Sequence, residues 1–173
     1  MLSVSRFSHV RIVLMYLIAI TFSLCISYFI LFFLFPYFFE NKVPKIGLKS
    51  LVSVGLIFIL SFLGYFTAFN IHDPELSNRF LHGFGGGFMA LFVCFLAARD
   101  SGVHVKRFQF VLFSLLVVTA LGVANEILEF ILQNYIRMVF SISINDTWLD
   151  LISNTVGMLI AVVGLAPFIN NKK

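Results

Sequence analysis

The stretch Ile12–Phe35 reads IVLMYLIAITFSLCISYFILFFLF and carries no charged side chain. A helix needs about 20 apolar residues to cross the hydrocarbon core of a membrane. The run is too long for a typical signal-peptide core and lacks a clear small-residue cleavage site, so it predicts a membrane anchor. We expect this span to stop near Pro36, because proline interrupts a helix.

Four further apolar runs follow at lengths that suit membrane spans. The first span is predicted at residues 12–35, and the other four roughly at 48–69, 79–98, 108–132 and 147–169. These runs are too long for strands, and an open sheet cannot satisfy its edge groups in lipid. The sequence therefore predicts an all-α, polytopic membrane protein with five transmembrane helices, in a single membrane domain over residues 1–173.

The composition agrees with this class of protein. Of the 173 residues, 60% are hydrophobic and 12% are charged, and the mean hydropathy is +1.01. Soluble domains do not reach such values. The net charge of +4 comes from basic residues in short loops and termini, so it does not indicate a nucleic-acid partner. Cys25 and Cys94 lie in separate apolar runs and are predicted to be core or lipid-facing residues.

The distribution of lysine and arginine predicts an orientation. The side that holds the N-terminus has Arg6, Arg11, Arg79 and Arg137. The opposite side has Lys42, Lys45, Lys49, Arg99, Lys106, Arg107, Lys172 and Lys173. Because positive loops stay in the cytoplasm, this bias favours the N-terminus outside and the C-terminus inside.

Several residues are expected at the membrane interface. Trp148 fits an aromatic belt, and the basic residues beside the spans suit interface anchors. These basic residues are Arg79, Lys106, Arg107, Lys172 and Lys173. Between the last two spans lies the segment 133–146, in which apolar and polar side chains alternate over 140–145. Such alternation predicts an extended segment at the interface.

Most acidic residues gather on one side of the predicted membrane. Six of the eight are in this group: Asp73, Glu75, Glu126, Glu129, Asp146 and Asp150. Carboxylates are costly in hydrocarbon, so by default they indicate a functional site. Glu126 is the hardest to explain otherwise, since it lies roughly 9 Å before the end of its span at the helical rise. Asp73 and Glu75 are interpreted as ordinary loop charges.

Helical spacing aligns the polar residues within the spans. Asp146, Asp150 and Asn154 recur at i, i+4 and i+8, so they share one face if the fifth helix begins early enough. On the fourth span, Glu126 and Glu129 are three residues apart and also point to one side. The polar patches of the third, fourth and fifth spans are thus expected in the same half of the membrane.

Small residues accompany the polar ones. On the third span, Gly83 and Gly87 have GxxxG spacing beside His82, and the fifth span continues its polar face with Gly157, Ala161 and Gly164. No basic or hydroxyl residue follows the glycines as in a phosphate-binding loop. These residues therefore predict close helix packing.

The polar residues allow both a structural and a functional interpretation. His82 alone could be a satisfied core histidine, Glu129 could be solvated, and Asp146 or Thr147 could cap the fifth helix. Taken together, they favour a ligand-binding pocket in the outer half of the membrane. The predicted pocket residues are His82, Glu126, Glu129, Asp150 and Asn154.

Three motifs in this half of the chain resemble a known family. Residues 78–84 read NRFLHGF, 125–130 read NEILEF, and 145–157 read NDTWLDLISNTVG. Their order resembles the VanZ-like group of small bacterial membrane proteins and the related YjdF-type proteins, over roughly residues 78–164. The resemblance implies a multi-pass protein of the bacterial plasma membrane. It also implies an association with low-level glycopeptide (teicoplanin) resistance.

Three classes of function stay open. An embedded enzyme could hold Mg²⁺ or Mn²⁺ against the phosphate of a lipid-linked envelope intermediate, or could use one carboxylate as a general acid or base. A binding or transport protein could take a cationic ligand, a lipid head group, a proton or a cation. A structural protein could pair its carboxylates with Arg79, Arg137 and His82. We expect binding of an envelope-related or glycopeptide-related ligand, with membrane lipid around it.

Overall fold

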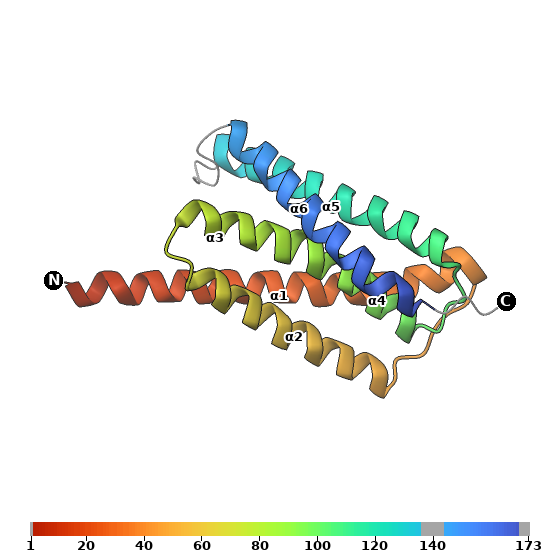
Figure 1. The fold of residues 1–173 in the computed structure, drawn as a ribbon. Helices are drawn as coiled ribbons and strands as arrows, with labels where there is room; N and C mark the ends of the chain where they lie inside the picture. The colour runs from red at the N-terminus through yellow and green to blue at the C-terminus, as the bar shows by residue number, and fades with distance from the viewer. Residues whose placement is uncertain (1, 136–143, 170–173) are drawn as a thin grey trace.

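The computed structural model describes the backbone of residues 2–135 and 144–169, and the side chains of residues 17–135 and 145–169. Within these ranges the chain is helical and forms no strand, which confirms the all-α prediction (Figure 1). The elements are α1 (Leu2–Glu40), α2 (Leu48–Phe69), α3 (Pro74–Leu81), the π-helix η1 (His82–Met89), α4 (Ala90–Asp100), α5 (Arg107–Tyr135), α6 (Ile144–Leu165) and the 3-10 helix η2 (Ala166–Phe168).

Five helical stretches of the described chain are long and apolar enough to cross a membrane, as predicted. They are Leu17–Glu40, Leu48–Phe69, Pro74–Asp100, Arg107–Tyr135 and Asn145–Phe168. The third of these joins α3, η1 and α4 into one continuous span. In Figure 1, α1 begins at one end of the bundle and α6 finishes at the other, as an odd number of crossings requires.

The first helix continues through Pro36 to Glu40, so the predicted stop near Pro36 is wrong. Packing favours the extra turn, because Phe39 meets Phe113 of α5 edge-on, with ring centroids 5.7 Å apart. This contact helps to offset the backbone hydrogen bond that proline cannot donate. Asn41 then ends the helix with φ of 51°, a left-handed conformation that asparagine tolerates.

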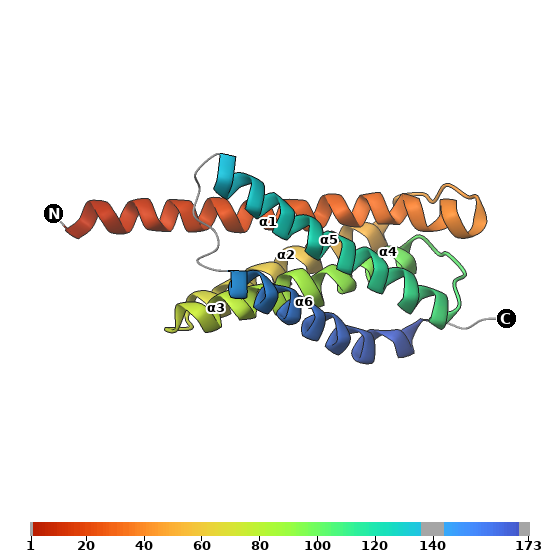
Figure 2. The ribbon, with the colours of Figure 1, turned by 90° about the horizontal axis from the view of Figure 1, so that it is seen from above.

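The centre of the bundle is α4. Its residues Val93–Ala98 are all buried, and it contacts α1 on one side and α6 on the other (Figure 2). Tyr28, Phe32 and Phe35 of α1 belong to the same buried core. The outward faces of α2 and α5 instead expose large apolar side chains, as lipid-facing helices do. Cys25 and Cys94 are buried free thiols, which confirms their interpretation.

Glycines set the approach of α6 to the third span. A Cβ atom on Gly157 would collide with the backbone carbonyl of Gly83, and one on Gly87 would collide with the backbone of α6. The predicted close packing at these glycines is therefore confirmed. Ala161 is fully buried, but a Cβ on Gly164 would meet open space, so the predicted small-residue face ends before Gly164.

The segment between α5 and α6 differs from the prediction where it is described. Gln133–Tyr135 and Ile144–Asp146 are helical and not extended, because a helix satisfies its own backbone groups near lipid. Neither Asp146 nor Thr147 caps the fifth helix, since α6 already begins at Ile144. The remaining residues of this segment, 136–143 with Arg137, lie outside the described residues, as do Lys172, Lys173 and the side chains of Arg6 and Arg11.

Candidate functional site

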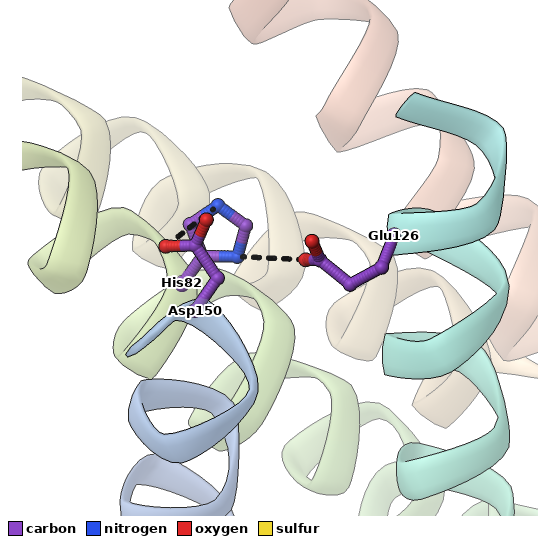
Figure 3. A group of neighbouring side chains, drawn as sticks. All are labelled: His82, Glu126 and Asp150. Atoms are coloured by element: carbon purple, nitrogen blue, oxygen red, sulfur yellow. Dashed lines mark ion pairs between the residues drawn. The ribbon is translucent and has the colours of Figure 1, made fainter. Parts of the chain in front are cut away.

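Three of the predicted pocket residues meet inside the bundle. His82, Glu126 and Asp150 come from three different spans, and one donor atom of each lies within 4.8 Å of the other two (Figure 3). The imidazole lies between the carboxylates, with Nε2 3.5 Å from Asp150 Oδ1 and Nδ1 4.0 Å from Glu126 Oε1. The three side chains are at most 15% exposed. We refer to these three residues as the carboxylate–histidine cluster.

Residues of α3 hold Asp150 in place. Arg79 forms one ion pair with Asp150 and another with Asp146, and Asn78 Nδ2 donates to Asp150 Oδ1 at 3.0 Å. Arg79 also donates to the backbone carbonyl of Asp146 at 3.1 Å. The Arg79 side chain is only 16% exposed, and its ion pairs with α6 agree with the structural alternative, in which Arg79 pairs with the carboxylates. The two carboxylates of α6 offer it stronger partners than the interface does.

The start of α3 positions the side chains of Asn78 and Arg79. Asp73 caps the helix, because its Oδ1 accepts from the backbone N–H groups of Glu75 at 2.9 Å and Leu76 at 3.2 Å. Pro74 occupies the first turn, where its missing N–H is not needed. The third span thus begins at Pro74, before the predicted residue 79. Asp73 acts as the N-cap of this span, which agrees with its interpretation as a charge outside the pocket.

A π-helix carries His82 and the glycine run. In η1 each turn is wider than in an α-helix. Such π-helices are rare in proteins, and those that occur are often found at functional sites. Asn154 lies one helical turn beyond Asp150 and packs between two glycines. A Cβ on Gly86 would collide with Asn154 Oδ1, and a Cβ on Gly122 would lie 3.4 Å from Asn154 Nδ2. Asn154 Oδ1 is buried and accepts no hydrogen bond.

Glu126 is the least compensated member of the cluster. The residue is 9% exposed, and its buried Oε1 accepts no hydrogen bond from the residues that the structure describes. Its ion-pair partner, His82, lies 4.0 Å away, beyond hydrogen-bonding distance. An ionised carboxylate without a close partner costs several kcal/mol in a low-dielectric interior. Glu126 is therefore the member of the cluster that a cation beside Oε1 would stabilise most.

Glu129 lies outside the cluster although it is only three residues from Glu126. Its Oε1 accepts from Asn125 Nδ2 at 2.8 Å on the same helix, and both residues line a cavity. The five predicted residues therefore divide into three in the cluster and two, Glu129 and Asn154, that line the cavity outside the cluster.

The cavity has a volume of about 480 Å³ and lies between α1, α2, the third span and α5, with Asn154 of α6 also in its wall. Near the end of the bundle where α3 begins, the wall gathers the polar side chains Tyr65, Asn78, His82, Asn125 and Glu129 beside leucines such as Leu81 and Leu128. Farther along the spans the wall is formed by apolar side chains such as Leu24, Met89 and Leu121, with the hydroxyls of Ser27 and Ser61. His82 belongs to both the cluster and the cavity wall.

Sequence reasoning missed Asn78 and offered Arg79 only as a partner of the carboxylates in the structural alternative. Asn78 and Arg79 precede His82 by four and three residues, so helical spacing could have placed all three on one face. The wall contributed by α1, including Ser23 and Ser27, carries a weaker signal, since isolated serines are common in membrane helices.

A buried carboxylate at the opposite end of the bundle provides a contrast. The Asp100 side chain is fully buried, and it accepts hydrogen bonds from Tyr28 Oη at 2.9 Å, Arg99 Nε at 2.8 Å and Ser53 Oγ. Each neighbour supplies a donor, so this carboxylate is satisfied by the protein itself. Glu126 has no such set of donors.

Comparison with known proteins places the chain in a membrane-protein family. No curated protein and no solved structure matches it. A family model described as "Predicted membrane protein (DUF2238)" matches residues 8–171, which include all five spans and every residue of the cluster. The match supports the membrane class without selecting the VanZ-like or YjdF-type group. The chain belongs to this DUF2238 family of predicted membrane proteins.

Proposed function

We propose that this protein binds an amphiphilic, envelope-related ligand in its cavity. The observation that carries the proposal is that a cavity of about 480 Å³ gathers amide, imidazole and carboxylate side chains at one end and continues along the spans between apolar side chains and a few serine hydroxyls. Small-molecule sites commonly have volumes of about 300–1,000 Å³ and a few placed polar groups on an apolar lining. A ligand with a polar head and an apolar chain matches both walls.

The polar wall suits a head group that both donates and accepts hydrogen bonds. Asn78 and Asn125 provide amides, and Glu129 provides a carboxylate that is already oriented by Asn125. Amides recognise hydroxyl and amide groups, and a carboxylate attracts an amine. Lipid-linked envelope intermediates and glycopeptides carry such groups, in agreement with the resemblance to the VanZ-like proteins.

The proposed orientation brings the polar wall toward the outer face of a bacterial plasma membrane. The bias of eight against four basic residues favours the side of the C-terminus as cytoplasmic. The polar wall lies at the opposite end of the bundle, where α3 begins. A ligand from the envelope would then reach it without crossing the membrane.

Binding is tested with the purified protein in detergent micelles and a fluorescent short-chain polyprenyl diphosphate that carries an N-acetylated sugar. The sugar supplies the hydroxyl and amide groups that Asn78 and Asn125 would recognise. The key variant is Gly85→Leu, because Gly85 lines the cavity and has open space at its Cβ position. Gly55→Leu is the matched control, since Gly55 also has open space but is exposed on α2, away from the cavity. We expect Gly85→Leu to lose at least about tenfold in affinity, a difference of about 1.4 kcal/mol.

The control should bind the probe as the wild type does. Equal binding by the wild type and a folded Gly85→Leu variant would rule out this cavity as the site. Saturable binding that only the Gly85→Leu variant loses would support it.

The ion pairs of Arg79 favour a second, structural function for part of the site. They join α3 to α6 through Asp146 and Asp150, both of which are largely buried. Pairing of this kind fixes the relative position of two spans. It accounts for Arg79 and Asp146. It gives no role to His82, which lines the cavity, or to Glu126, whose closest ion-pair contact is His82 at 4.0 Å.

A further inference from the structure

We propose that His82, Glu126 and Asp150 bind one divalent transition-metal ion, Zn²⁺ or Mn²⁺, at the wall of the cavity. This site deepens the proposed function and rests on it for its purpose, because the ion would attract an anionic group of the bound amphiphile. Its existence is tested separately from ligand binding.

The separations within the cluster are close to those of a metal site. Two ligand atoms on a tetrahedral Zn²⁺ ion lie about 3.4 Å apart when each bond is about 2.0–2.1 Å long. His82 Nε2 and Asp150 Oδ1 are already 3.5 Å apart. One nitrogen of His82 and one oxygen of each carboxylate lie within 4.8 Å of one another, so side-chain adjustments of about 1 Å would bring this set to the separations of a metal site.

Unpartnered oxygen atoms point to a missing positive partner. Among the described residues, Glu126 Oε1 is buried without a hydrogen-bond donor, and its carboxylate points at His82 (Figure 3). Asn154 Oδ1, on the next turn of α6 after Asp150, is likewise buried with no donor in this part of the chain. Buried acceptors without donors are rare in proteins, and carboxylate and amide oxygens are both metal ligands.

Charge balance favours a divalent ion. Arg79 supplies one positive charge against the three carboxylates of Asp146, Asp150 and Glu126. Because an imidazole binds a metal ion in its neutral form, the metal-binding group has a net charge of −2, which a divalent cation cancels. Glu75 also approaches Arg79, but its side chain is 73% exposed and is therefore screened by water.

The donor types select the class of metal. An imidazole nitrogen suits zinc and other transition metals and is a poor ligand for Mg²⁺ or Ca²⁺, whereas carboxylates also suit Mn²⁺. The sequence alone favoured Mg²⁺ or Mn²⁺. The His82 imidazole disfavours Mg²⁺, is compatible with Mn²⁺ and makes Zn²⁺ a further candidate. Three protein ligands leave at least one coordination position open, as in metal sites that receive a substrate.

The test measures metal bound to the full-length protein. Protein purified in detergent is stripped with EDTA, incubated with Zn²⁺ or Mn²⁺ and desalted, and the metal per chain is measured by mass spectrometry. The variants are His82→Gln and Glu126→Gln, with Glu75→Gln as a control that removes an exposed carboxylate outside the cluster. We expect about one ion per wild-type chain and at least about tenfold weaker binding in both cluster variants, since even outer ligand partners contribute that much.

The control should bind metal within about twofold of the wild type. The proposal is overturned if the wild type retains no more metal than a monodisperse Glu126→Gln variant. Where that variant does not remain monodisperse, the visible spectrum of Co²⁺ bound to the wild type decides. A spectrum typical of Co²⁺ with four or five ligands supports the site. The spectrum of Co²⁺ surrounded by six water molecules overturns it.

Ligand measurements separate the two proposals. Probe binding that Gly85→Leu abolishes but EDTA leaves unchanged would uphold the cavity and overturn the role of the metal in it. Metal retention without probe binding would uphold the metal site and overturn the proposed ligand.

Discussion

Arg79 of α3 is ion-paired with Asp150 of α6, although the two residues are 71 positions apart in the chain. The Asp150 side chain is 3% exposed, so the pair is shielded from water. It fixes the depth at which α6 meets the third span, and with it the position of Asp150 beside His82. The cluster depends on this contact.

Removal of Arg79 should destabilise the bundle. Arg79→Gln leaves the buried Asp150 without its cationic partner, and losing one member of a buried pair costs about 3–5 kcal/mol. The reference is Glu75→Gln, which removes only an exposed partner of Arg79 at 3.7 Å and should change stability by less than about 0.5 kcal/mol. Thermal unfolding in detergent measures both, and similar melting temperatures for the two variants would contradict the prediction.

Glu126→Gln should not destabilise the metal-free protein. The Glu126 carboxylate is buried without a hydrogen bond, so a neutral amide of similar shape removes an unfavourable charge. We expect the EDTA-stripped variant to be as stable as the wild type or more stable by about 1–2 kcal/mol. Unfolding curves of the stripped proteins provide the measurement. A loss above about 1 kcal/mol would show that the charge of Glu126 stabilises the fold by itself.

A methyl group on Gly157 should disturb the contact between α6 and the third span. Because its Cβ would collide with the carbonyl of Gly83, Gly157→Ala should cost about 1–3 kcal/mol. Gly164→Ala is the matched substitution on the same helix, where the Cβ meets open space. It should be neutral or stabilising by up to about 1 kcal/mol, since alanine favours a helix. Equal stability of the two variants would refute the close approach.

The orientation can be read from the labelling of single cysteines. His72 lies between α2 and α3, and Lys45 lies between α1 and α2, at opposite ends of the bundle. With the N-terminus outside, His72→Cys should react with a membrane-impermeant maleimide on intact cells, and Lys45→Cys should react only after lysis. Native Cys25 and Cys94 are buried and should give little background. The reverse labelling pattern would place the polar wall of the cavity at the cytoplasmic face.

Helical spacing predicted the depth of the site in the membrane better than it predicted which residues form the cluster. It aligned Asp150 with Asn154 and brought Glu126 to the level of His82, and the structure places the cluster residues within 4.8 Å. It could not separate Glu126 from Glu129, because residues three apart on a helix differ by about 60° in direction. The rotation of α5 about its axis decides which of the two faces His82.

The sequence by itself determined the membrane class, the five helices and the shared depth of the polar residues. It could do so because lipid acts on each segment separately, through length, apolarity and backbone hydrogen bonding. Only the tertiary structure decided that Arg79 pairs with α6, that Glu126 meets His82, and that α1 closes the cavity. These contacts depend on how the helices rotate and approach, which glycine packing and ion pairs between distant residues determine together.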